Sequence, residues 1–297
     1  MNLPRRQFLA TGVATGAAIA TAPPISLAEE KPVELGQIGK TPHTKFAVNI
    51  EMWWTKLPFL DRIKKVAELG FPGYEFWPYQ GKDLKAIAKL NEELGLECSQ
   101  FTAWGFDPGM NNPANEDKFI AQIEEACGVA KELKVRKMCV VAGNNQKGMS
   151  QEAMLAQVTK ALKRAAPIVE KHKVMLILEP MNGRVDHPGH CLYGSTDAVK
   201  ICRAVDSPMV KINWDLYHMH ISEGDLCGHM KEGFDQIGYL QLADHPGRNE
   251  PGTGEIHYNR VLKEAIALGY KDFVGLECRP LGDEVTAAKR VAAADVW

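Results

Sequence analysis

Residues 174–180 read Val-Met-Leu-Ile-Leu-Glu-Pro, an apolar run that ends in a glutamate and a proline. The same arrangement recurs downstream at 210–215 (VKINWD), 237–242 (IGYLQL) and 273–277 (FVGLE). Short, nearly continuous apolar runs indicate strands that are covered on both faces, as in parallel sheets. Each of these four runs carries one polar side chain at or near its end, namely Glu179, Asp215, Gln241 and Glu277.

Four further apolar runs precede these, and a helical pattern follows each of the eight. The expected strands are Phe46–Ile50, Gly73–Trp77, Leu96–Phe101, Lys137–Ala142, Val174–Leu178, Val210–Trp214, Ile237–Leu242 and Phe273–Leu276. Eight β-then-α units predict an α/β fold, a single-domain (β/α)8 TIM barrel over residues 45–297. No G-x-G-x-x-G follows the first strand, which argues against a dinucleotide-binding sheet. The sixth helix, expected at about 224–234, has the weakest pattern because three glycines dilute it.

The first 28 residues have the composition of an export signal. Arg5-Arg6-Gln7-Phe8-Leu9 is followed by an apolar run rich in alanine and glycine, and Ser26-Leu27-Ala28 supplies small residues for cleavage. This order predicts a twin-arginine-type signal peptide at 1–28 and a periplasmic location, with a frayed N-terminal helix as the alternative. Residues 29–44 are expected to form a polar linker.

Composition narrows the classes of partner. The 297-residue chain has 35 lysines and arginines against 37 aspartates and glutamates, a net charge of −2, which gives no reason to expect nucleic acid. Seven cysteines without C-x-x-C spacing indicate buried thiols rather than a disulfide framework. We expect a small-molecule substrate, with no membrane association after removal of the signal. The sequence is compatible with a homo-oligomer and does not determine the oligomeric state.

The four polar strand ends suggest a metal site. Strand ends meet at the C-terminal face of a barrel, where TIM-barrel chemistry lies. Three carboxylates that converge there would repel one another unless a cation compensates them. An all-oxygen set of Glu179, Asp215, Gln241 and Glu277 favours one divalent ion, Mn²⁺ or Mg²⁺. The alternative is that the four residues form separate ion pairs or strand-end caps.

Other side chains are candidates for substrate contact. His218 follows Asp215 by three residues and could donate a hydrogen bond to a substrate oxygen, unless it is a solvent-facing loop residue. Arg248 lies in a loop rich in glycine and proline and could hold a substrate by a forked contact. Glu51, Glu75 and Gln100 lie at or near strand ends and are either cavity-lining or structural.

Aromatic residues gather after the first three expected strands. They are Trp53, Trp54, Trp77, Trp104 and Phe106. They predict an apolar wall on one half of the barrel mouth, which is the usual form of a small-molecule site, or else ordinary loop packing.

The strand-end pattern resembles the xylose-isomerase-like TIM barrels, and among them the hydroxypyruvate isomerase family. The stretches that carry the resemblance are Leu178-Glu179-Pro180-Met181-Asn182, Val185-Asp186-His187-Pro188-Gly189, Trp214-Asp215-Leu216-Tyr217-His218-Met219, Leu240-Gln241-Leu242-Ala243-Asp244 and Glu250-Pro251-Gly252-Thr253-Gly254-Glu255-Ile256. Earlier in the chain, Gly73-Tyr74-Glu75-Phe76 is similar to the family's second strand.

The resemblance implies that Glu179, Asp215, Gln241 and Glu277 bind the metal, and that Glu179 and Glu277 also act as acid and base. It implies that His218 and Arg248 touch the substrate, to which we add Glu75 and His187. The chain departs from hydroxypyruvate isomerases in three features, which leave the substrate open. These are the run Ser99–Thr102, where the family has a histidine, the loop Arg184–His187, and the export signal.

Together these features predict a metal-dependent isomerase or epimerase. Its substrate would be a small hydroxy-keto acid, hydroxypyruvate-like, or a sugar, and the reaction would be proton transfer through an enediolate. One alternative is a metal-dependent hydrolase of the endonuclease-IV-like kind, which would need more histidines for a zinc cluster. Another is a non-catalytic exported sugar-binding protein.

Overall fold

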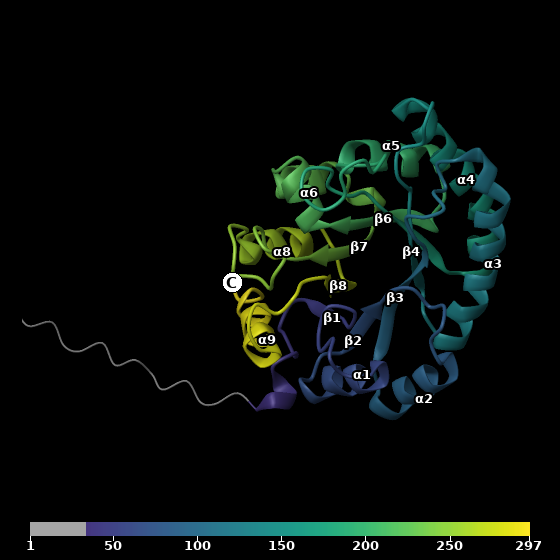
Figure 1. The fold of residues 1–297 in the computed structure, drawn as a ribbon. Helices are drawn as coiled ribbons and strands as arrows, with labels where there is room; N and C mark the ends of the chain where they lie inside the picture. The colour runs from purple at the N-terminus through teal and green to yellow at the C-terminus, as the bar shows by residue number, and fades with distance from the viewer. Residues whose placement is uncertain (1–33) are drawn as a thin grey trace, which may run out of the picture. The chain divides into compact units, whose positions relative to one another are not determined.

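Eight parallel strands form a closed barrel in the computed structural model, which describes residues 34–297 (Figure 1). They are β1 (Lys45–Asn49), β2 (Gly73–Phe76), β3 (Glu97–Trp104), β4 (Lys137–Val141), β5 (Met175–Glu179), β6 (Val210–Asp215), β7 (Ile237–Leu242) and β8 (Phe273–Leu276). The last strand pairs with the first, with Gly275 opposite Ala47, so no strand edge stays open. The predicted (β/α)8 barrel is confirmed.

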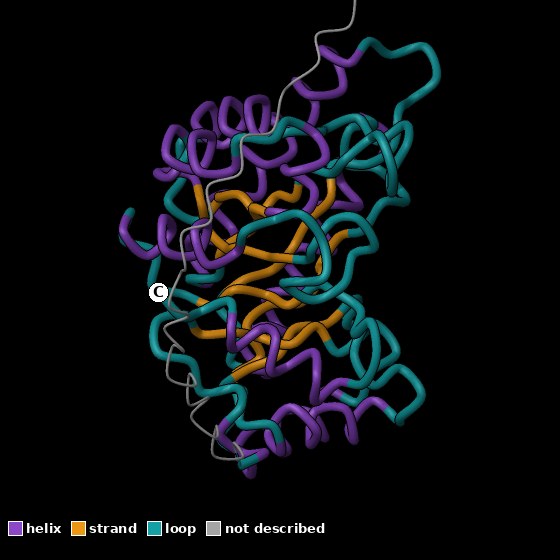
Figure 2. Tube along the Cα trace, turned by 90° about the vertical axis from the view of Figure 1, so that its left-hand side faces the viewer, coloured by secondary structure: helices purple, strands orange, loops and turns teal. Residues whose placement is uncertain are grey.

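Helices surround the strands on the outside, as Figure 2 shows. They are α1 (Phe59–Glu68), α2 (Leu84–Leu94), α3 (Glu116–Leu133), α4 (Gln151–His172), α5 (Ser195–Val205), α6 (Leu216–Ser222), α7 (Leu226–Glu232), α8 (Tyr258–Ala267) and α9 (Glu284–Ala293). The helix expected at about 224–234 corresponds to α7, and α6 is an addition that the sequence pattern did not reveal. It begins directly after β6 because the Asp215 carboxylate accepts a hydrogen bond from the Tyr217 amide at 2.9 Å.

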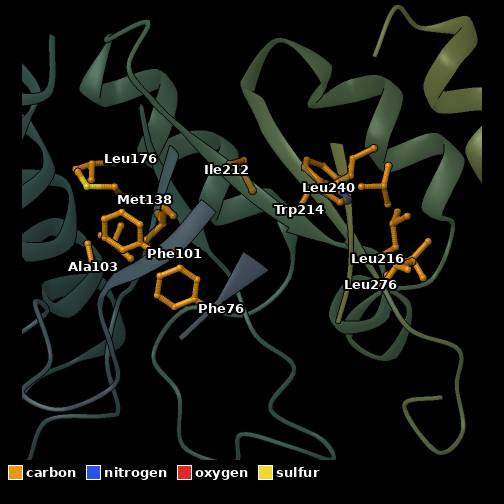
Figure 3. Close-up of a cluster of buried hydrophobic side chains, with 14 of the residues drawn as sticks. Phe76, Phe101, Ala103, Met138, Leu176, Ile212, Trp214, Leu216, Leu240 and Leu276 are labelled. Carbon is orange, nitrogen blue, oxygen red and sulfur yellow. The ribbon is translucent and has the colours of Figure 1, made fainter. Parts of the chain in front are cut away.

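Successive strand residues point alternately into the barrel and toward the helices. The outward residues build the main core, and Figure 3 shows part of it, from Phe76 and Phe101 to Leu240 and Leu276. Phe76 stacks on Phe101 with the ring centroids 6.0 Å apart. This continuous apolar layer fixes the strands against the helices and thereby fixes the direction of every inward side chain.

The inward residues change from apolar to polar along the barrel. A small apolar cluster fills the interior toward the start of the strands, made of Ala47, Cys139, Ile177, Tyr239 and Phe273. In three of these strands the inward position two residues further along is polar instead, namely Asn49, Glu179 and Gln241. The closed interior is therefore mostly apolar at one end and more polar at the C-terminal end, where a site can form.

The N-terminal part of the chain needs one revision. The predicted signal, 1–28, and the first part of the predicted linker lie outside the described residues. The remainder, 34–44, packs on the barrel: η1 (Leu35–Gln37) is a short 3-10 helix and Ile38 is buried in the core. The buried Asp295 carboxylate accepts hydrogen bonds from the His43 amide at 2.8 Å and the Thr44 amide at 3.1 Å.

All seven cysteines are free thiols, and six of them are buried, as predicted. Between residues 34 and 297, no helix has the length and apolar character that crossing a membrane requires.

We expect Asp295→Ala to lower the free energy of unfolding by about 2–4 kcal/mol, because the buried Thr44 amide and hydroxyl and the partly buried His43 amide lose their acceptor. Urea unfolding followed by circular dichroism measures the change. Glu132→Ala, a change of an exposed residue on α3, serves as the control and should shift stability by less than about 0.5 kcal/mol. Equal stability of the two variants would contradict an anchoring role for Asp295.

Candidate active site

Three carboxylates and one histidine meet at the C-terminal end of the barrel. Glu179 ends β5, Asp215 ends β6, Glu277 follows β8, and His218 lies in α6. Each offers a ligand atom, these atoms all lie within 4.8 Å of one another, and all four residues are buried. The strand ends that the sequence singled out therefore converge, and separate ion pairs do not describe Glu179, Asp215 and Glu277.

The negative charge of this cluster suits a bound cation. Burial raises the pKa of Glu179 and Asp215 well above the usual range, and the charge of Glu277 raises both further. Between residues 34 and 297, the buried Oδ2 atom of Asp215 has no hydrogen-bond partner. Arg248 supplies one positive charge, with Nη2 2.9 Å from Glu277 Oε2 and 3.8 Å from Asp215 Oδ2. Three carboxylates exceed one guanidinium, so the donor set fits a divalent ion.

Gln241 lies beside this cluster in a second polar group inside the barrel. Its Nε2 donates to Glu75 Oε1 at 2.7 Å, and its Oε1 accepts from Asn213 Nδ2 at 2.5 Å. The amide oxygen keeps a second lone pair with which it could join a metal. Gly275 leaves the space for this pair, because a Cβ atom there would lie 2.3 Å from Glu75 Oε2 and 2.9 Å from Gln241 Cγ.

Glu75, expected as a substrate contact, lies fully buried and is not among the residues that line the cavity. Its carboxylate also accepts from Asn49 Nδ2 at 3.0 Å and from the Tyr239 hydroxyl at 2.8 Å. Burial, and then the charge of Glu277, raise the pKa of Glu75 to about 7 although these donors oppose the shift. The geometry thus gives Glu75 contact with Gln241 rather than with the cavity.

The orientation of the His218 ring is fixed by Asn182, a residue that the sequence analysis quoted without a role. The Asn182 Oδ1 atom accepts from the amides of Val185 and Asp186 at 3.0 and 3.1 Å, which turns its NH₂ group toward the ring. Asn182 Nδ2 lies 2.7 Å from His218 Nδ1, so Nδ1 is the acceptor and Nε2 carries the hydrogen.

His218 is therefore a donor aimed at the acids. Its Nε2 lies 3.5 Å from Asp215 Oδ2 and 3.8 Å from Glu179 Oε1. Burial lowers the pKa of His218 well below the usual value, which keeps the ring neutral. The solvent-facing alternative is wrong because the side chain is completely buried.

Arg248 reaches the cluster from a loop that Asp244 organises. The Asp244 carboxylate accepts hydrogen bonds from five backbone amides of the segment 245–256, at distances between 2.8 and 3.1 Å. Neither Asp244 nor Asn182 could be singled out from the sequence by itself, although both lie in the stretches that carry the family resemblance.

A cavity of about 510 Å³ opens onto Glu179, Glu277, His218 and Arg248. Of the predicted aromatic wall, Trp77 and Phe106 line it. Trp53 and Trp104 are instead buried in the core. The remaining lining residues are Pro78, Gln80, Thr102, Ala103, Gly105, Asp107, Gln122, Val141, Met181 and His187.

Of the other residues that the sequence singled out, one lines the cavity and two do not. His187 stacks on Phe106 with the ring centroids 4.8 Å apart, so both belong to one wall of the cavity. Glu51 pairs with Lys82 at 2.7 Å, away from the lining residues. Gln100 is buried, its side-chain amide has no hydrogen-bond partner among the described residues, and it does not line the cavity.

We expect Asn182→Ala to release the His218 ring, so that its two neutral tautomers mix. Nitrogen-15 NMR of the imidazole should give the Nε2–H tautomer in the parent protein and a mixture in the variant. Asn145→Ala, a change of an exposed asparagine, is the control. An Nδ1–H ring in the parent protein would contradict the orientation derived above.

Comparison with known proteins places the chain among relatives of the same architecture. It matches the xylose isomerase-like TIM barrel family over residues 63–294. The hydroxypyruvate isomerase of Escherichia coli (strain K12) is 33% identical over 243 residues, covering 80% of this chain and 93% of the relative. The 2-oxo-tetronate isomerase of Cupriavidus necator is 31% identical, covering 80% and 93%.

A solved structure, described as AP endonuclease, family 2, from Brucella melitensis, aligns with a TM-score of 0.78 at 27% identity. The alignment covers 82% of this chain and 96% of that one. The resemblance to hydroxypyruvate isomerases that the strand ends predicted is thus confirmed, and the chain belongs to the xylose isomerase-like TIM barrel family.

Proposed function

We propose that this chain is a divalent-metal-dependent isomerase or epimerase of a small hydroxy-keto acid or a sugar. One observation carries the proposal: the buried carboxylates of Glu179, Asp215 and Glu277 lie close together beside a cavity. The similarity to proteins named hydroxypyruvate isomerase and 2-oxo-tetronate isomerase supports the same class of reaction. From residues 1–28 alone we further propose export to the periplasm by a twin-arginine-type route.

The metal would be held by Glu179, Asp215, Glu277 and the Gln241 oxygen, an oxygen set that suits Mn²⁺ or Mg²⁺. When bound, such an ion supplies Lewis-acid polarisation of a substrate carbonyl, which acidifies the neighbouring C–H bond. His218 Nε2–H would donate a hydrogen bond to a substrate oxygen from the same side of the cavity.

Glu179 and Glu277 would move the proton. Both line the cavity, but their surroundings differ: Glu277 is paired with Arg248 at 2.9 Å, whereas Glu179 accepts a hydrogen bond from the Cys139 thiol at 3.2 Å. Because no guanidinium pairs with Glu179 at this distance, we assign it the removal of the proton. Return of the proton to the adjacent carbon gives isomerisation, and return to the opposite face of the same carbon gives epimerisation.

Glu179→Gln should leave the barrel folded but lower turnover by about 10²- to 10⁴-fold, because the amide cannot accept the proton. Deuterium uptake from D₂O into a panel of small keto acids and ketoses measures the reaction before the substrate is known. Glu132→Gln is the matched control and should exchange like the parent protein. Exchange by Glu179→Gln at the parent rate would overturn the acid–base assignment.

Glu75 has a supporting role in this proposal. Its carboxylate accepts a hydrogen bond from Gln241 Nε2. This contact fixes the orientation of the Gln241 amide, so that its Oε1 atom is the one offered to the metal. We expect the parent protein to bind one Mn²⁺ per chain in calorimetry. Glu75→Gln should bind it about 10- to 100-fold more weakly, as is usual when a residue that orients a ligand is lost. An unchanged affinity of Glu75→Gln for Mn²⁺ would contradict this role.

The metal content of the purified protein also separates the alternatives. Several zinc ions would favour the hydrolase, but the cluster holds a single histidine among the described residues, fewer than a zinc cluster normally uses. Absence of any bound ion after equilibration with Mn²⁺ would favour a sugar-binding protein without catalysis.

A further inference from the structure

The cavity is larger than a three-carbon substrate requires. Its volume is about 510 Å³. Hydroxypyruvate has seven non-hydrogen atoms, and even with the roughly 30 Å³ that one water molecule takes in the liquid for each atom, it fills only about 210 Å³. A hexose with twelve such atoms fills about 360 Å³ on the same generous scale. The space therefore admits a substrate as large as a hexose.

The charges around the cavity do not favour an anionic substrate. Among the described residues that line it, Arg248 is the only lysine or arginine, and Glu277, Asp215 and Asp186 all lie within 3.9 Å of its guanidinium group. Even with a divalent ion in place, its two charges and that of Arg248 only balance Glu179, Asp215 and Glu277. No surplus positive charge is left for a substrate carboxylate or phosphate.

The histidines do not supply that charge. Asn182 Nδ2 donates to His218 Nδ1 at 2.7 Å, so this ring carries its hydrogen at Nε2 alone, and the His187 ring is stacked on Phe106 in the cavity wall. Asp107 adds a further carboxylate to the lining.

The wall away from the carboxylates offers groups that suit a sugar. Trp77 and Phe106 are partly exposed aromatic surfaces on which the C–H face of a sugar ring can pack. Gln122 donates its Nε2 to the Ala103 carbonyl at 2.6 Å, which leaves its Oε1 to accept from a hydroxyl group. Gln80 and Thr102 are further neutral hydrogen-bonding groups in the same lining.

We propose that the substrate of this site is a neutral keto sugar or keto glycoside of at least hexose size, rather than a three-carbon keto acid. This inference rests on the proposed function and makes its substrate class specific. Trp77 and Phe106 then hold the part of the sugar that does not react, while the carbonyl end faces Glu179 and Glu277.

The test compares neutral and anionic substrates on the Mn²⁺-loaded protein. Deuterium uptake from D₂O is measured for ketohexoses and methyl 3-keto-glucoside on one side, and for hydroxypyruvate on the other. We expect kcat/KM for at least one neutral sugar to exceed that for hydroxypyruvate by at least about 100-fold, a difference of roughly 2.7 kcal/mol in transition-state binding. Equal or faster exchange with hydroxypyruvate overturns the inference and leaves the proposed function standing.

Variants of the wall provide the second readout. Trp77→Ala and Phe106→Ala should each raise KM for the sugar by about tenfold or more with kcat within threefold, because they remove binding that is uniform along the reaction. Neither change should alter KM for hydroxypyruvate. Trp77→Phe should restore most of the affinity, and Trp297→Ala, outside the cavity lining, is the aromatic control. Equal effects on the sugar and on hydroxypyruvate would overturn the role of the wall.

Calorimetric binding separates the remaining outcomes. If the neutral sugar binds saturably but takes up no deuterium, neutral sugars are ligands of this site and the proposed catalysis is overturned. If no neutral sugar binds and none exchanges deuterium, the inference is overturned.

Discussion

The arrangement of this protein depends on one electrostatic constraint: three buried carboxylates are held together at the C-terminal end of the barrel. Glu179, Asp215 and Glu277 come from different strands, and their ligand atoms lie within 4.8 Å of one another and of a His218 ring nitrogen. Charges in such a place are costly unless they are compensated. Three observations follow from that constraint: Arg248 compensates the charges in part, one Asp215 oxygen has no hydrogen-bond partner among the described residues, and the pKa values of Glu179 and Asp215 are raised.

Around the carboxylates, a second set of side chains limits how they and their neighbours can turn. Asn182 fixes the His218 ring, Glu75 fixes one end of the Gln241 amide, and Asp244 holds the loop that carries Arg248. A site that has to place a proton donor and a base beside one substrate carbon benefits from such restriction, because small displacements are costly to catalysis.

Members of one barrel family can share the polar end and differ in the walls that face it. The relatives with 31–33% identity are named for two different isomerase activities, and the solved structure with 27% identity is described as an endonuclease. Fold and reaction class therefore do not choose the substrate. In this chain the cavity wall that faces the carboxylates includes Trp77, Phe106 and Gln122, which belong to the loops and helix after β2 and β3 rather than to the carboxylate-bearing strands, and under the proposed function these residues select the substrate.

The sequence by itself determined the barrel and the polar strand ends, because apolar runs and side-chain alternation are local properties of the chain. It could not show that α6 begins at Leu216 with Asp215 as its N-cap, or that Trp53 and Trp104 turn into the core while Trp77 and Phe106 face the cavity. It also could not join Glu75 to Gln241, which lie 166 residues apart. These features depend on ring closure and on the tilt of the strands, which bring distant residues together in a way that local patterns do not record.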